Sequence, residues 1–104
     1  MTVRLFVYGS LKRQGRHHAE LRGATFLGEA HTLAGYALEP VGEYLALVEA
    51  AGAGSVSGEL YEADEALLVD LDDFEGEGYE RRALTVVGQN SENVAALAYL
   101  RRTR

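Results

Sequence analysis

The chain has 104 residues, 47% of them hydrophobic, and its 16 acidic residues outnumber ten lysines and arginines to give a formal net charge of −6. This length predicts one domain, residues 1–104, with a single hydrophobic core. The acidic balance argues against a nucleic-acid-binding protein, because such proteins carry a basic surface. Since cysteine is absent, disulfides, thiolate zinc sites and cysteine nucleophiles are excluded.

The first half of the chain predicts mainly strands. Residues 3–8 are mostly apolar, β-branched or aromatic, which is typical of a central strand buried on both faces. Residues 16–22 predict a short helix that ends at Gly23. Further strands are expected within 25–38, where glycines indicate a turn or bulge, and at 44–48 and 56–62.

The second half predicts one clear helix and a hairpin. Asp64 can cap a helix over 64–74, along which apolar side chains recur at helical spacing, and Gly76 suits its end. Strands at 79–87 and 94–100 are joined by a turn as a hairpin. The order β-α-β-β-β-β-α-β-β predicts an α+β fold with two short helices and a curved or closed sheet.

Metals, cofactors and membranes are not indicated. The histidines, which are His17, His18 and His31, lack a metal-binding spacing such as H-E-x-x-H, so we expect no metal and no cofactor. No apolar run approaches the length of about 18 residues that predicts a membrane helix. Arg4 interrupts the first apolar run, so no signal peptide is predicted. We therefore expect a cytoplasmic protein.

Glu75 occupies an unusual place in the acidic stretch Val69–Arg82. Counting along the helix from Leu68 through Leu71 puts Glu75 on the apolar stripe, whereas the other acids suit a solvated face. A carboxyl near the core is costly to ionise, so its pKa should rise, and it could then accept and donate protons near neutral pH. The alternative is a structural ion pair with Arg4, Arg81 or Arg82.

The other informative stretch is Tyr8-Gly9-Ser10-Leu11, "YGSL", where the first strand stops. Gly9 permits a backbone turn that other residues rarely adopt, after which several N–H groups can converge on an anion or oxyanion. Ser10 lacks the G-x-S-x-G context of a serine nucleophile. The alternative is the plain end of a strand.

Together these segments resemble the γ-glutamylcyclotransferase-like superfamily, which includes γ-glutamylamine cyclotransferases and plant avirulence-induced-gene-like proteins. The resemblance is carried, in order, by "FVYGSLKR" (6–13), His18, "GATFLGEAHTLAGYAL" (23–38), "VSGELYE" (56–62), "LDDFEG" (71–76), "YERRALTV" (79–86) and Tyr99. It implies a small, mixed, β-barrel-like sheet with a cavity at one end.

The resemblance also implies a chemistry. In the family, the α-amine of a γ-glutamyl group attacks its own γ-carbonyl and releases 5-oxoproline, without a metal. Glu75 maps onto the acid/base glutamate, and Tyr8, Gly9, Ser10 and Leu11 onto the substrate-binding loop, with Tyr79 as a further substrate-binding residue. The roles of Tyr36, Tyr99 and His18 stay open.

The chain departs from the family pattern around the expected cavity. It reads "KRQGRHH" after "YGSL", lacks a proline in Tyr44–Leu47, and has a short gap between Glu75 and Tyr79. The substrate therefore stays open, and so does the oligomeric state. Two alternatives to an enzyme are a small-molecule-binding protein on the same fold and an interaction module that uses the acidic segment.

Overall fold

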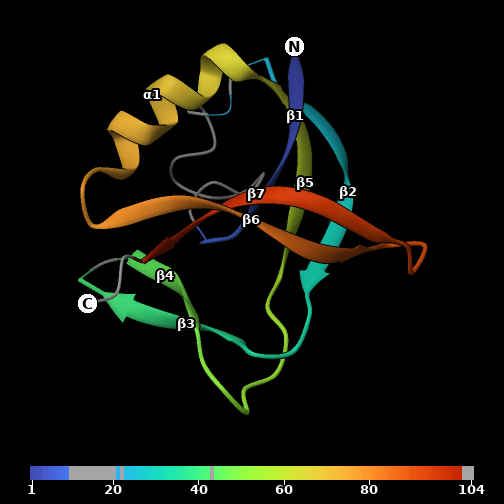
Figure 1. Ribbon diagram of the computed structural model, residues 1–104, viewed down its shortest axis with the longest axis vertical. Helices are drawn as coiled ribbons and strands as arrows, with labels where there is room; N and C mark the ends of the chain where they lie inside the picture. The colour runs from blue at the N-terminus through green and yellow to red at the C-terminus, as the bar shows by residue number, and fades with distance from the viewer. Residues whose placement is uncertain (10–20, 22, 43, 102–104) are drawn as a thin grey trace.

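The computed structural model describes residues 1–9, 21, 23–42 and 44–101 (Figure 1). Its elements are β1 (Thr2–Val7), β2 (Thr25–Thr32), β3 (Tyr36–Val41), β4 (Tyr44–Glu49), β5 (Ser57–Asp64), α1 (Glu65–Glu75), β6 (Tyr79–Gly88) and β7 (Asn93–Arg101). No helix in the described part of the chain is long and apolar enough to cross a membrane. The helix predicted over 16–22 falls almost entirely outside the described residues and stays a prediction.

Five strands close into a barrel-like ring. The sheet runs β1-β5-β2-β6-β7, and a parallel pairing of Leu5 with Leu97 joins β1 back to β7. The hairpin of β3 and β4 extends this ring, because β4 pairs with the end of β7 (Figure 1). The α+β class with a mixed, barrel-like sheet is thus confirmed, and β2 carries a bulge between Phe26 and Gly28.

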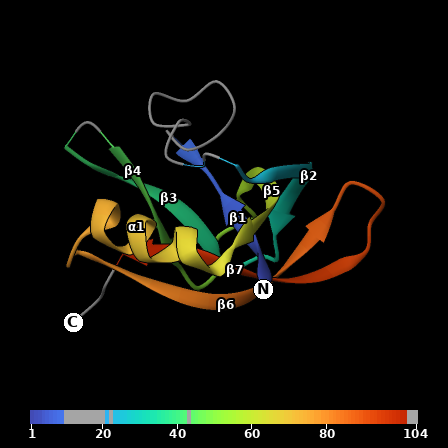
Figure 2. The ribbon, with the colours of Figure 1, turned by 90° about the horizontal axis from the view of Figure 1, so that it is seen from above.

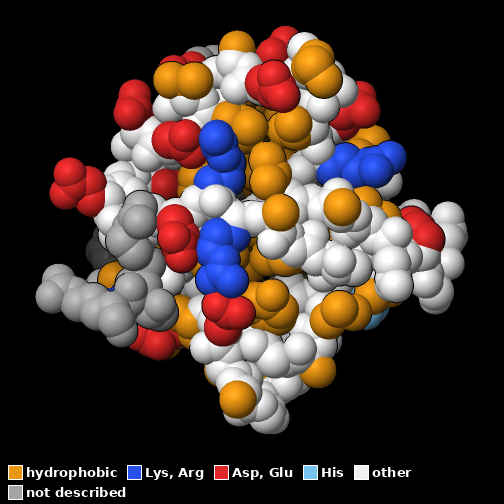
Figure 3. Space-filling view, in the orientation of Figure 1, with side chains coloured by type: hydrophobic (Ala, Val, Ile, Leu, Met, Phe, Trp, Pro, Cys, Tyr) orange, Lys and Arg blue, Asp and Glu red, His pale blue; other side chains and the backbone are white. Residues whose placement is uncertain are grey.

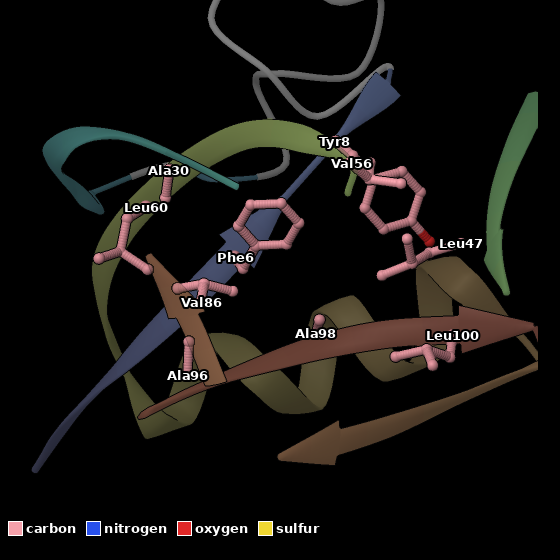
Figure 4. Packing of buried hydrophobic residues seen from close by; sticks show 10 residues of the cluster. All are labelled: Phe6, Tyr8, Ala30, Leu47, Val56, Leu60, Val86, Ala96, Ala98 and Leu100. Atoms are coloured by element: carbon pink, nitrogen blue, oxygen red, sulfur yellow. The ribbon is translucent and has the colours of Figure 1, made fainter. Parts of the chain in front are cut away.

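Strand β1 pairs with β5 and β7, and from Leu5 onward it is buried on both faces as its sequence predicts, whereas Thr2 and Arg4 are exposed. Leu5 and Val7 belong to the core beneath α1, whereas Phe6 and Tyr8 belong to a second core inside the ring. Figure 4 shows the rings of Phe6 and Tyr8 in this second core, with Tyr8 beside Leu47. The alternation follows from the period of two along a strand.

Helix α1 covers one side of the ring (Figure 2). Asp64 caps it as predicted, since its carboxylate accepts a hydrogen bond of 3.0 Å from the N–H of Ala66. The leucines of its apolar stripe, which are Leu67, Leu68 and Leu71, are buried against side chains of β1, β5 and β7. This packing fixes the helix so that its last turn lies at the start of β6.

Candidate active site

Glu75 is the last residue of α1 and is half-buried. The helix ends at Gly76, which has a φ of 78° and donates its N–H to the carbonyl of Asp72 at 3.0 Å. Burial raises the pKa of Glu75 from 4.5 to about 7. The carboxyl that the helical phase singles out can therefore exchange a proton near neutral pH.

The alternative of a structural ion pair for Glu75 finds no support among the described residues. Arg81 binds Asp72 at 3.1 Å, and Arg82 binds Glu49 at 2.7 Å. No salt bridge joins Glu75 to these arginines or to Arg4 in the described part of the chain. On the face seen in Figure 3, basic side chains lie next to acidic ones.

Tyr8 shares the neighbourhood of Glu75. Its hydroxyl is buried and donates a hydrogen bond to the main-chain carbonyl of Tyr99. Burial is the main cause of a strongly raised pKa for Tyr8; the negative charge of Glu75 and the neighbouring Tyr79 act in the same direction, whereas a main-chain hydrogen bond from Leu47 opposes them. Because Glu75 and Tyr79 both act on its charge, these three side chains, predicted from distant motifs, lie in one neighbourhood.

The turn after β1 begins as the sequence predicts. Gly9 has a φ of 60°, a left-handed conformation that favours glycine. Ser10 and Leu11 lie outside the described residues, so the predicted anion-binding role of this loop stays a prediction. His18 lies outside them as well.

Tyr79 opens β6 just after the helix end and is half-buried. It lines an open hollow of about 650 Å³ whose other lining residues are Asp72, Asp73, Gly76, Glu77, Glu80, Arg81 and Tyr99. The described residues include no group of three or more histidines and carboxylates that could hold a metal ion. The hollow is lined mainly by carboxylates and phenols, which are groups that can form hydrogen bonds and exchange protons.

Sequence reasoning missed one contact that borders the site. The hydroxyl of Tyr99 donates to Asp72 Oδ1 at 2.6 Å, and Arg81 reaches the same carboxylate from the neighbouring strand. From its sequence context, Asp72 is predicted to lie on the solvated face with the other acids of this stretch. The available signal was its spacing, because Asp72 lies three residues before Glu75 and so on the same side of the last helical turn.

Comparison with known proteins gives consistent results. The family described as "Gamma-glutamyl cyclotransferase, AIG2-like" matches residues 5–104. The gamma-glutamylaminecyclotransferases of Rattus norvegicus and Bos taurus are 41% and 44% identical over 92 residues, with 79% of this chain covered. A solved AIG2-like protein from Mus musculus superposes with a TM-score of 0.87 at 32% identity, over 99% of this chain and 79% of that one.

The relatives are longer than this chain, which spans 62% of the rat protein and 55% of the bovine one. The match of the family nevertheless extends from β1 through the helix end to the last strand, and the fold agrees with it. The chain belongs to the gamma-glutamyl cyclotransferase, AIG2-like family.

Proposed function

We propose that this protein is a cyclising acyltransferase that releases 5-oxoproline from a γ-glutamyl amide. The observation that carries the proposal is Glu75, a half-buried carboxyl at the family's motif position whose pKa is raised to about 7 by burial. It lies in the neighbourhood of Tyr8, the residue before the Gly9 turn. A proton acceptor therefore lies in the neighbourhood of the residue that precedes this turn, and we expect the N–H groups that follow to bind a carboxylate or an oxyanion.

In the proposed reaction the substrate supplies its own nucleophile. Glu75 takes a proton from the α-ammonium group, and the free amine attacks the γ-carbonyl, forming the ring C–N bond. The bond from the γ-carbon to the leaving nitrogen then breaks as Glu75 returns the proton to that nitrogen. The ring nitrogen gives up its second proton to the released amine, which leaves as an ammonium ion. The products are 5-oxoproline and an amine, so one carboxyl serves as base and then as acid.

The remaining residues have supporting roles in this proposal. The N–H groups of the loop 9–11 bind the α-carboxylate or the developing oxyanion, and Tyr79 lines the side from which the leaving group departs. Holding the γ-glutamyl group of the substrate in a ring-forming conformation supplies much of the rate acceleration, because intramolecular reactions gain from orientation. Tyr8 keeps its proton, since its pKa is raised, and therefore binds and shapes without acting as a base.

The test is to incubate the full chain with a panel of γ-glutamyl amino acids and γ-glutamylamines and to measure 5-oxoproline by mass spectrometry. We expect wild type to release it and Glu75→Gln to lose at least about a hundredfold in kcat, within the range of general acid–base contributions. Asp70→Asn, a matched change of an exposed carboxylate of the same helix that does not line the hollow, should retain activity. Equal release by wild type and Glu75→Gln would refute the role of Glu75, and stabilisation by a γ-glutamyl compound without product would indicate a binding protein.

A further inference from the structure

The last turn of α1 is electrostatically unfavourable and needs support from outside the helix. Its acids, Asp72, Asp73 and Glu75, lie where the helix dipole places partial negative charge, and no basic residue lies in that turn. A helix end of this composition tends to fray. Glu75 is the last helical residue, so its position depends on whatever holds this turn.

Tyr99 of β7 supplies the buried contact. Only 3% of Tyr99 is exposed, and its hydroxyl donates to Asp72 Oδ1 at 2.6 Å and lies 3.4 Å from the carbonyl of Leu68. Arg81 lies directly opposite Tyr99 in the β6–β7 pair and binds the same carboxylate. That ion pair is 34% and 46% exposed, so water screens it and the contribution of the Tyr99 hydrogen bond should be larger.

The main chain of Tyr99 binds Tyr8. The carbonyl oxygen of Tyr99 accepts the hydrogen bond from the hydroxyl of Tyr8. Tyr99 thus binds the helix end through its side chain and Tyr8 through its backbone. Since β7 is paired with β6, β1 and β4, neighbouring strands hold the backbone of this residue in place.

We propose that Tyr99 is a positioning residue, which holds Glu75 and Tyr8 at a fixed separation by binding Asp72 with its hydroxyl and Tyr8 with its carbonyl. The proposal rests on the proposed cyclising activity for its catalytic consequence. Tyr99 acts through Asp72 and does not touch the reacting atoms. The geometry of the acid/base group is therefore set from β7, not from the helix that carries it.

The kinetic test uses Tyr99→Phe, which removes the hydroxyl and keeps the carbonyl that binds Tyr8. We expect kcat to fall about tenfold with KM changed less than about twofold, because a misplaced acid/base group slows the chemical step more than binding. Asp72→Ala removes the same hydrogen bond from an exposed position and should lower kcat as much as Tyr99→Phe does. Asp72→Asn keeps an acceptor for the Tyr99 hydroxyl and should retain most of the wild-type kcat. The double variant should lose no more than either single one.

Tyr61→Phe is the matched control, because it also removes a buried phenol hydroxyl from this core, one that donates to Glu59 of its own strand at 3.1 Å. A second readout does not need activity: ¹³C NMR titration of the Glu75 carboxyl. We expect Tyr99→Phe and Asp72→Ala to lower its pKa by about one unit as the loosened turn admits water, and Tyr61→Phe to leave it unchanged.

The outcomes separate the two proposals. If wild type makes no 5-oxoproline, the proposed function fails, while the titration still decides whether Tyr99 positions Glu75. If Tyr99→Phe and Asp72→Ala lower thermal stability but keep wild-type kcat and the wild-type titration, Tyr99 is only a packing residue and the positioning proposal is overturned.

Discussion

Replacing Glu75 by glutamine should change how the stability of the protein depends on pH. The pKa of Glu75 is about 7 in the folded state and 4.5 when unperturbed. Below pH 4.5 the carboxyl is protonated in both the folded and the unfolded state, so its titration does not change the free energy of unfolding. Between pH 4.5 and 7 the folded protein holds the proton more tightly than the unfolded chain, so the free energy of unfolding falls as pH rises.

The size of this effect follows from the shift. Each pKa unit corresponds to about 1.36 kcal/mol, so moving from 4.5 to about 7 amounts to about 3 kcal/mol if the side chain were fully screened from water. Glu75 is only half-buried, and solvent screening reduces the value to about 1.5 kcal/mol. Glutamine does not ionise, so Glu75→Gln should become more stable than wild type by this amount as pH rises through the window.

The measurement is urea unfolding, followed by circular dichroism, at several pH values from about 4.5 to 8. The quantity compared is the difference in unfolding free energy between Glu75→Gln and wild type at each pH, since charges elsewhere cancel in that difference. Asp73→Asn, an exposed carboxylate of the same turn, should show a much smaller slope. A difference for Glu75→Gln that stays flat across the range would refute the conclusion that burial raises the pKa of this carboxyl.

Three further predictions concern catalysis, the turn and the core. In the acid range kcat/KM should rise with an apparent pKa of about 7 as Glu75 loses its proton, and a rise centred near 4.5 would contradict this assignment. Gly9→Ala should lower the free energy of unfolding in urea by about 1–2 kcal/mol, because φ is 60° at this position. In the control Gly54→Ala, φ is not in the left-handed region and nothing lies near an added Cβ, so the free energy of unfolding should fall by less than about 0.5 kcal/mol. Leu71→Ala, at a fully buried position of α1, should lower the free energy of unfolding by about 2–5 kcal/mol. Val69 is 63% exposed, so Val69→Ala should change it by no more than about 0.5 kcal/mol. Equal effects would show that α1 is not packed by its leucine stripe.

Local sequence patterns were sufficient for the elements that carry the site. The mostly apolar run of β1 predicts burial on both faces, and Asp64, the leucine stripe and Gly76 delimit α1 within one or two residues. The phase of Glu75 is equally local, because it depends only on helical spacing. These features need no knowledge of which strands are neighbours.

The closure of the ring and the contacts of Tyr99 could not be read from local patterns. The pairing of Leu5 with Leu97 joins strands at opposite ends of the chain. The element order predicts a curved or closed sheet without saying which strands meet, and the family resemblance implies a barrel. The run of acids predicts a solvated face for Asp72, because charge runs usually face water. Its partners come from strands β6 and β7, where Arg81 faces Tyr99, and that register depends on the whole hairpin.

The pKa shifts separate the carboxyl of Glu75 from the two buried phenols near it. Burial is the main cause that raises the pKa of Tyr8 and of Tyr99, so both phenols keep their protons and serve as hydrogen-bond donors. Burial also raises the pKa of Glu75, but a carboxyl starts low, and the same physical effect brings it close to neutrality. Among the described residues with shifted values, Glu75 alone reaches the range in which one group can take a proton and return it. Burial therefore keeps a tyrosine protonated at neutral pH, whereas it brings the pKa of a glutamate close to neutral pH. For this reason a single carboxyl can carry both proton steps of the proposed reaction.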